Sequence, residues 1–355
     1  MKVGTDFSGI GAPEMALKYM GIDFESVFAC EIDKYARKSF EQLHNPKTFY
    51  KDITTRNHKE VERLDLYVAG FPCQSFSMAG KRKGFDETRG TLFFNVADFI
   101  KQNQPKCFVL ENVKGLISHD KGRTFQTIVD VLSNGGGTQN GQISLDVFKD
   151  GLGYHIYWQV LNTKHYGIPQ NRERIFIVGF KEFRNFSFPK KIPLSIKLKD
   201  ILQDVVDNKY FLSEKMTKFV TNTNFREAKP VSIDGIAPCQ KVGGDVTCFE
   251  LSKEVRTDEA KKKRKETGTN DFRDKKIEWR KQDYCNTITT SLTNDHYIKQ
   301  KKIRRLTPLE CWRLQGFKDN DFFKVKDVSD SQLYKQAGNS ITVDVLIHLF
   351  RKIYG

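Results

Sequence analysis

The sequence has no long hydrophobic run. It contains 355 residues, of which 38% are hydrophobic, and its mean hydropathy is −0.54. No apolar stretch approaches the roughly 20 residues that a membrane helix needs. The first residues also lack the hydrophobic segment of a secretory signal. We therefore expect a soluble protein with no membrane partner and no signal peptide.

Cysteine is scarce, and its spacing is irregular. The seven cysteines, at positions 30, 73, 107, 239, 248, 285 and 311, are odd in number and form no Cys-x-x-Cys pair. This pattern argues against a disulfide framework and against a zinc site, so no metal is expected. Reduced thiols fit a cytoplasmic location best, where one of them could act chemically.

Acidic residues are outnumbered by basic ones. Lys and Arg total 59 against 44 Asp and Glu, which gives a formal net charge of +15 at pH 7. Such a balance favours a polyanionic partner, nucleic acid first and a membrane surface second. Charge alone leaves open a basic protein with neither partner.

Short apolar runs alternate with amphipathic stretches through the first 180 residues. Strands are predicted at residues 3–5, 27–30, 66–69, 108–110, 157–161 and 175–178, with helices between them at 14–20, 34–43, 92–102 and 125–132. Pro13 suits the first turn of its helix, and Gly21 would close it. This alternation predicts an α/β fold with a doubly wound, mostly parallel sheet covered on both faces.

The regular alternation fades after Phe180. Prolines recur there, residues 261–265 form a basic run, and a helical pattern returns only at 341–353. We predict a catalytic and cofactor-binding domain from residues 1–183 and 326–355, and a smaller domain over 184–325. The glycine-rich stretch 135–141 is typical of a surface loop.

The turn between the first strand and the first helix holds a Gly-x-Gly pair. Gly9 and Gly11 permit a tight turn and close approach of a ligand. A dinucleotide fingerprint would need a third glycine where the sequence has Glu14, and a carboxylate at a helix start repels pyrophosphate. NAD and FAD are therefore disfavoured, and with them an NAD-linked oxidoreductase. Taken alone, the pair suits a structural turn as well as a ligand site.

Carboxylates follow the next two predicted strands. Glu31 lies at about the distance from Gly11 at which a carboxylate binds the ribose hydroxyls of an adenine nucleoside. Asp52 follows the third strand-like stretch. S-adenosylmethionine suits such a pocket, because it has a ribose, an adenine and a sulfonium but no phosphate. Ordinary strand-end capping is the alternative for both carboxylates.

The fourth predicted strand leads into a loop that contains a cysteine. Gly70 and Pro72 precede Cys73 at the strand end, where ligands of open α/β sheets bind. Residues 80–84 continue the loop with basic side chains between glycines, which suit phosphates. In this setting a reactive thiol is favoured over a buried structural cysteine.

Six motifs in this sequence resemble those of the cytosine-5 DNA methyltransferase family, of the bacterial and phage type found in restriction-modification systems. They are Asp6-Phe7-Ser8-Gly9-Ile10-Gly11, Pro72-Cys73-Gln74, Glu111-Asn112-Val113, Gln170-Asn171-Arg172-Glu173-Arg174, the segment 304–311 and Gly338-Asn339-Ser340. Each motif is weak alone, but six in family order are specific. The resemblance covers nearly the whole chain apart from about 184–300.

The resemblance implies a methyltransferase domain that binds S-adenosyl-L-methionine, with a small target-recognition domain across a DNA-binding cleft. Around the cofactor it places Phe7, Gly9, Gly11, Glu31, Ile32, Asp52, Ile53, Pro72, Leu92, Asn339 and Ser340. Two positions depart from the family pattern. Thr5 stands where relatives often carry an aspartate, which leaves Asp6 without an assigned role. Ala79 stands where relatives can carry a polar residue near the gap left by a flipped base.

The resemblance also implies covalent chemistry with four catalytic residues, Cys73, Glu111, Arg172 and Arg174. The Cys73 thiolate would add to C6 of cytosine, so that C5 becomes nucleophilic enough to accept a methyl group. Glu111 would donate a proton to N3 as the general acid. Arg172 and Arg174 would activate the thiol and grip the flipped nucleotide, although their alternation before an apolar run also suits a solvated strand edge.

Double-stranded DNA is the implied partner, and the target base must leave the stack before it reacts. Contacts with DNA are assigned to Gln74, Ser77, Ala79, Lys81, Arg82, Asn112, Gln170, Thr289 and Thr290. Thr289 and Thr290 lie in a polar β-branched run that resembles the end of a recognition domain, with an ordinary strand as the alternative. The basic run 261–265 would contact phosphates without reading sequence.

Two other functions stay open at this point. A tRNA cytosine-5 methyltransferase shares this architecture, although the long basic middle segment and the motif order favour DNA. A non-catalytic DNA-binding protein would have no need of Cys73, Glu111 and both arginines. We expect a monomer and leave open a companion restriction endonuclease. The sequence does not specify the target site, the host or the base that removes the C5 proton.

Overall fold

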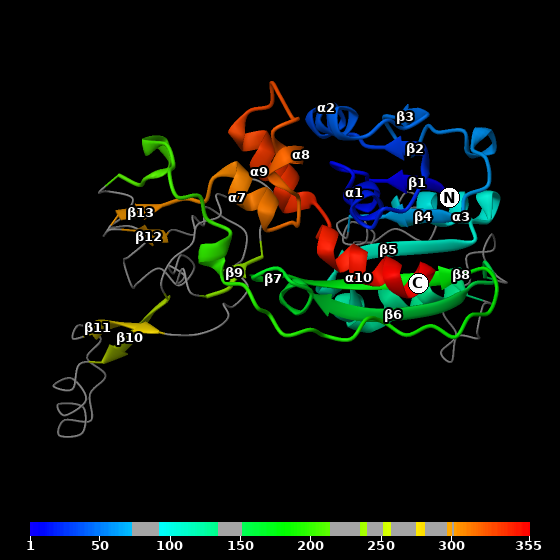
Figure 1. The fold of residues 1–355 in the computed structure, drawn as a ribbon. Helices are drawn as coiled ribbons and strands as arrows, with labels where there is room; N and C mark the ends of the chain where they lie inside the picture. The colour runs from blue at the N-terminus through cyan, green and yellow to red at the C-terminus, as the bar shows by residue number, and fades with distance from the viewer. Residues whose placement is uncertain are drawn as a thin grey trace, which may run out of the picture.

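A computed structural model describes residues 1–72, 92–133, 151–213, 235–239, 251–256, 275–280, 297–299 and 302–355 (Figure 1). Several predictions concern residues outside these ranges. They are those for Cys73, Gln74, Ser77, Ala79, Lys81, Arg82, Thr289 and Thr290, for the stretch 135–141 and for the basic run 261–265. These stay predictions.

A seven-stranded sheet forms the centre of the molecule, in the order β3-β2-β1-β4-β5-β8-β6. Its strands are β1 (Lys2–Asp6), β2 (Glu25–Cys30), β3 (Thr48–Tyr50), β4 (Leu66–Ala69), β5 (Cys107–Val113), β6 (His155–Asn162) and β8 (Glu173–Phe180). Strands β1 to β5 pair in parallel, whereas β8 runs antiparallel to both β5 and β6. The predicted doubly wound, mostly parallel sheet is confirmed, and each predicted strand lies within an observed one.

Helices cover both faces of the sheet, because successive side chains of a buried strand point to opposite faces. On one face, α1 (Ala12–Tyr19) and α10 (Val343–Tyr354) share a buried cluster with Val68 and Val109 of the neighbouring strands β4 and β5. On the other face, α3 (Leu92–Asn103) and α4 (Arg123–Leu132) share a cluster with Tyr67 and Phe108. The alternation of strands and helices along the sequence predicted this burial of both faces of the sheet.

The helix ends follow the local signals in the sequence. Helix α1 begins after Gly11, which has a φ of 79°, and Pro13 lies in its first turn. Gly21, with a φ of 69°, follows its end. The predicted helix 34–43 matches α2 (Lys34–Leu43), whose N-cap Asp33 accepts hydrogen bonds from the backbone N–H groups of Tyr35 and Ala36. The other predicted helices agree with the observed ones to within two residues at each end.

The remaining elements join the middle of the chain to this core. Strand β7 (Gln170–Asn171) pairs with β9 (Ala237–Pro238), β10 (Leu251–Arg256) with β11 (Lys275–Arg280), and β12 (Tyr297–Lys299) with β13 (Lys302–Arg304). Helices α7 (Pro308–Arg313), α8 (Asp319–Phe322) and α9 (Asp330–Asn339) follow. Leu198, Leu306 and Trp312 belong to the same buried cluster as α1 and α10. Both ends of the predicted smaller domain therefore pack on the core.

Short 3₁₀ helices complete the described secondary structure, at His58–Glu60, Lys114–Gly122, Thr163–His165, Leu198–Asp200 and Asn208–Tyr210. The second of these contains an irregular turn at 119–121. Within the ranges that the structure describes, no helix is both long and apolar enough to cross a membrane.

Candidate active site

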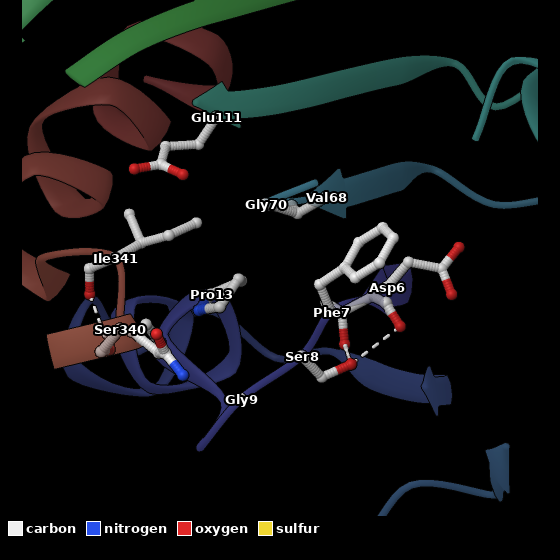
Figure 2. A pocket seen from close by; sticks show the side chains of 13 residues that line it. Asp6, Phe7, Ser8, Gly9, Pro13, Val68, Gly70, Glu111, Ser340 and Ile341 are labelled. Atoms are coloured by element: carbon white, nitrogen blue, oxygen red, sulfur yellow. Dashed lines mark hydrogen bonds between the residues drawn. The ribbon is translucent and has the colours of Figure 1, made fainter. Parts of the chain in front are cut away.

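A pocket lies at the carboxyl ends of β1, β4 and β5, where ligands of open α/β sheets bind (Figure 2). Its walls are Thr5, Asp6, Phe7, Ser8, Gly9, Ala12, Pro13, Val68, Gly70, Glu111, Asn339, Ser340 and Ile341. They come from the turn between β1 and α1, from the ends of β4 and β5, and from the segment that ends α9. The fold thus joins predicted cofactor residues from both ends of the chain to the predicted acid, Glu111.

The turn after β1 holds its backbone in an uncommon conformation. Phe7 has a φ of 53°, in the left-handed region that a bulky residue rarely adopts. Ser8 anchors the turn, because its backbone N–H donates to the Cys30 carbonyl (3.0 Å) and its hydroxyl accepts from the Cys30 N–H (2.9 Å). At Gly11 a Cβ would lie 2.3 Å from the ring of His44. Such over-determined strain is typical of ligand sites.

Glu31 ties β2 to this turn. Its carboxylate accepts the backbone N–H of Gly9 and that of Asp33, each at 2.9 Å. A carboxylate has lone pairs left for a further donor after two such bonds. The next residue, Ile32, is 75% exposed, so an apolar surface lies open beside Glu31.

The other predicted cofactor residues lie at varying depth around the same edge. Asp52 forms a local turn by accepting the N–H and the hydroxyl of Thr54, each at 2.8 Å. Ile53 is buried, Pro72 is exposed, and Leu92 is the first residue of α3. Among the predicted set, the walls of the pocket itself contain Phe7, Gly9, Asn339 and Ser340.

Asp6, which had no assigned role, forms a buried ion pair beneath the pocket. Its carboxylate accepts both Nη atoms of Arg56, at 2.6 and 2.7 Å, and the hydroxyl of Tyr67 at 2.6 Å. The Arg56 guanidinium lies 4.4 Å from the ring centres of both Phe28 and Phe99. Sequence reasoning missed Arg56, because nothing in its local sequence marks a buried partner.

Glu14 does not act as the sequence interpretation assumed. Its side chain is fully buried under the turn and is absent from the pocket walls, so it does not face a ligand phosphate. Oε1 accepts the Thr5 hydroxyl at 2.7 Å, whereas Oε2 has no hydrogen-bond partner among the described residues. Burial raises the pKa of Glu14 to about 7. The argument that its charge repels pyrophosphate is therefore wrong. Only the absence of the third glycine still argues against a dinucleotide such as NAD or FAD.

Glu111 and Asn112 lie near the carboxyl end of β5 and have different partners. Glu111 lines the pocket, and Figure 2 shows its side chain directed toward Ile341. Its Oε1 lies 3.1 Å from Nε of Arg174. The Asn112 amide donates to the carbonyl of Phe71 at 2.8 Å, two residues before Cys73. Asn112 is buried, and its predicted contact with DNA stays a prediction.

Arg172 is held inside the protein. Its exposed fraction is 3%, and Nη2 donates to the carbonyls of Gly338 (3.2 Å) and Ser340 (2.9 Å). The alternative of a solvated strand edge is therefore wrong for this residue, whereas its contact with a flipped nucleotide stays a prediction. Gln170 is also fully buried and donates to the Leu314 carbonyl at 3.2 Å. The DNA contact expected of Gln170 stays a prediction.

Cys239 is the residue of this site that sequence reasoning missed. Its sulfur accepts Nη1 of Arg172 at 3.3 Å and Nη2 of Arg174 at 3.5 Å. Burial by itself would raise the pKa of this thiol, but the charges and hydrogen bonds of the two arginines bring it below its ordinary value. A signal did exist, since Pro238-Cys239-Gln240 repeats the tripeptide Pro72-Cys73-Gln74.

Known proteins match this chain along nearly its whole length. The sequence model of the family described as C-5 cytosine-specific DNA methylase matches residues 1–355. The Type II methyltransferase M.HpaII of Haemophilus parainfluenzae is 37% identical, with 98% of this chain and 87% of the relative covered. The Orphan methyltransferase M.SPRI of Bacillus phage SPR is 33% identical, with 99% and 97% covered.

Solved structures of methyltransferases have a similar fold. The Dnmt2 methyltransferase of S. pombe gives a TM-score of 0.63 at 17% identity, covering 99% of this chain and 96% of that one. A DNMT2 mutant of Spodoptera frugiperda gives 0.65 at 17% identity, covering 100% and 99%. At this level of identity, the likeness shows the fold alone.

Proposed function

Because this chain belongs to the C-5 cytosine-specific DNA methylase family, and so transfers a methyl group from S-adenosylmethionine to C5 of cytosine in DNA, we propose how its residues share that reaction. One observation carries the assignment. Glu111 faces the same pocket as Phe7 and Asn339, while Asn112 beside it binds the backbone that leads into Cys73. The proposed acid and the proposed cofactor site therefore share one edge of the sheet, and Asn112 binds there to the backbone two residues before Cys73.

The pocket suits S-adenosylmethionine, which supplies an electrophilic methyl group when bound. No described residue of its walls is basic, as expected for a ligand without phosphate. We assign Glu31 to the ribose hydroxyls, because its carboxylate keeps acceptor capacity after binding Gly9. The exposed Ile32 would cover the adenine. Gly9 and Gly11 would let the backbone approach the ligand closely.

In the proposed reaction Cys73 acts as the nucleophile. Its thiolate forms a bond to C6, the C5–C6 double bond opens toward C5, and Glu111 gives its proton to N3. C5 then bonds to the methyl carbon as the bond from that carbon to the sulfonium breaks, and a neutral thioether leaves. A base takes the C5 proton, the C6–sulfur bond breaks, and N3 returns its proton, so that thiolate and acid are restored. Arg174, 3.1 Å from Glu111, stabilises the carboxylate that exists between the two proton transfers.

DNA would be bound with the target cytosine flipped out of the helix. We propose that the part of 184–325 between the core-packed ends is the recognition region, with Thr289 and Thr290 reading bases and residues 261–265 contacting phosphates. Gln74, Ser77, Ala79, Lys81 and Arg82 would contact the DNA around the flipped base. The enzyme would act as a monomer in the cytoplasm, where DNA and reduced thiols occur together, and any companion endonuclease would be a separate chain.

The covalent step is tested by trapping. A duplex that carries 5-fluorocytosine at the target has no C5 proton to lose, so the enzyme should remain attached after denaturation when cofactor is present. Cys73→Ala should abolish the adduct, whereas Cys107→Ser, at a buried cysteine on β5 far from the nucleophile in sequence, should keep it. An adduct formed by the Cys73→Ala variant would refute the assignment. Labelled methyl transfer to tRNA exceeding that to duplex DNA would favour the RNA alternative.

A further inference from the structure

The chain contains the tripeptide Pro-Cys-Gln twice, at 72–74 and at 238–240. The second copy begins at Pro238, the last residue of β9, and this strand pairs in parallel with β7 and so brings the middle of the chain to the edge of the active site. The pairing is tight, because the Ala237 N–H donates to the carbonyl of Pro169 at 2.6 Å. Cys239 thereby reaches the two arginines of the Gln-x-Arg-x-Arg motif.

Two guanidinium groups converge on one buried sulfur. Cys239 is 9% exposed and lies 3.3 Å from Arg172 and 3.5 Å from Arg174. Among the described residues, the charged groups facing Cys239 are Arg172 before β8 and Arg174 on β8, with Glu111 of β5 behind Arg174. Two cations beside a single carboxyl group leave an excess of positive charge among the described groups of this buried site. A thiolate between the arginines neutralises it, and hydrogen bonds to a charged group are stronger than neutral ones.

The contacts form a chain across the site. Arg172 joins Cys239 to the carbonyl of Ser340, whose residue lines the cofactor pocket, and Arg174 joins Cys239 to Glu111. We propose that Cys239 is a positioning residue for methyl transfer, which holds both arginines by an anionic sulfur and so fixes Glu111 relative to the cofactor. This role rests on the proposed function, in which Glu111 is the acid, and Cys239 itself touches no reacting atom.

The state of the sulfur can be measured without turnover. In a Cys73→Ala background, the ultraviolet absorbance of thiolate at neutral pH should fall when Cys239→Ser is added. Cys107→Ser is the matched control, because Cys107 is also buried but burial raises its pKa, so its loss should leave the absorbance unchanged. Equal absorbance with and without Cys239 overturns the proposal.

Kinetics test the positioning role. Cys239→Ser and Cys239→Ala should lower kcat about tenfold or more, with a smaller change in the KM for DNA, because the acid is misplaced in the transition state. The ratio of wild-type to Cys239→Ser kcat should be largest above neutral pH and should shrink toward one as the pH falls and the thiolate takes a proton. A ratio that does not vary with pH shows a packing role only and overturns the proposal.

Trapping separates this proposal from the assignment of Cys73. If Cys239→Ser still forms the 5-fluorocytosine adduct and Cys73→Ala does not, the assignment of Cys73 as the nucleophile is supported. The kinetic results then test the positioning role of Cys239 alone. If the adduct instead survives Cys73→Ala and disappears with Cys239→Ser, then Cys239 is the nucleophile. In that outcome the positioning role and the assignment of Cys73 are both wrong.

Discussion

Charged side chains in this protein are most informative where they are buried beside the pocket. Asp6 and Glu14 lie eight positions apart in the sequence and are both inaccessible to solvent, yet their environments differ. Asp6 faces a guanidinium and a phenol, whereas Glu14 faces a single hydroxyl. A buried carboxylate is stable as an anion only when it is paired, and burial raises the pKa of Glu14 to about 7, so Glu14 is a group that titrates.

The state of Glu14 predicts a pH-dependent stability. Its pKa is about 7 in the folded protein against an ordinary 4.5, mainly because of burial, so the folded state binds the additional proton. This contribution is fully present below pH 4.5 and is lost as the pH rises through 7. It amounts to about 3 kcal/mol, at about 1.4 kcal/mol for each pKa unit. Above pH 8, Glu14→Gln should therefore be more stable than wild type.

Urea denaturation at pH 5, about 7 and above 8 checks this prediction. The stability difference between Glu14→Gln and wild type should grow with pH, while Glu41→Gln, at an exposed site on α2, should show no such trend. If the Glu14→Gln difference is the same at all three pH values, Glu14 does not titrate in this range.

Arg56 supports the strained turn through Asp6. Arg56→Leu leaves the Asp6 charge unpaired and should cost about 3–5 kcal/mol of stability. Because Asp6 directly precedes Phe7 of the pocket wall, Arg56→Leu should also raise the dissociation constant of S-adenosylmethionine, measured by calorimetry. Adding Asp6→Asn removes the stranded charge, so the double variant should be more stable than Arg56→Leu alone. A double variant as unstable as the sum of the two single ones would mean that the pair is not coupled.

At the scale of elements, helix α7 is fixed by one carboxylate. Glu310 accepts two Nη atoms of Arg304 at 2.7 and 2.8 Å, the N–H of Gln203 at 2.7 Å and the N–H of Thr307 at 2.8 Å. Thr307 in turn caps the helix by accepting the N–H of Glu310. The single side chain thus joins β13, α7 and the loop before the 3₁₀ helix at 208–210.

Breaking this junction should cost far more than breaking an exposed pair of the same spacing. Glu310→Ala should lower the free energy of unfolding by about 3–5 kcal/mol, because it strands the buried Arg304. Asp319→Ala is the matched control. Asp319 accepts hydrogen bonds from Nη2 and Nε of Arg313, at 2.6 and 2.8 Å, and the two residues are also six positions apart. This pair is partly exposed, so the loss of Asp319 should cost about 1 kcal/mol or less. Chemical denaturation of both variants gives the comparison, and equal losses would contradict it.

At the scale of the whole molecule, the charge of +15 belongs to a protein that binds a polyanion. Phosphate contacts are sensitive to salt, because each one releases a counterion, whereas contacts with base edges carry the sequence preference. The proposed recognition region contains both kinds of side chain in separate segments.

Neutralising the five basic residues of 261–265 should weaken binding to every duplex alike. The slope of log affinity against log salt should flatten by about one for each phosphate that the variant no longer neutralises. Substituting Thr289 or Thr290 should instead change the penalty for a mismatched site, by about 1–3 kcal/mol per base. Binding isotherms over a salt series, with matched and mismatched duplexes, separate the two effects. If only the basic-run variant loses discrimination between matched and mismatched duplexes, then residues 261–265 recognise the base sequence.

The sequence by itself determined the sheet, its helices and the family. Alternating apolar runs specify strands and helices locally, and glycine, proline and capping residues mark their ends, so α2 could be predicted to the residue. The order of six short motifs identified the chemistry, because functional residues at strand ends stay in fixed order along a doubly wound chain. Glu111, Phe7 and Asn339 were expected at one site, and the structure places them around one pocket.

Only the tertiary structure decided which charged and polar side chains are inside and what they face. Asp6 pairs with Arg56 and Cys239 contacts two arginines, although these partners lie far apart in the sequence. Glu14 and Gln170 are polar residues that the fold turns inward. No local pattern encodes such partners. The protonation of a buried group depends on desolvation and on nearby charges, and both are set only when the chain has folded.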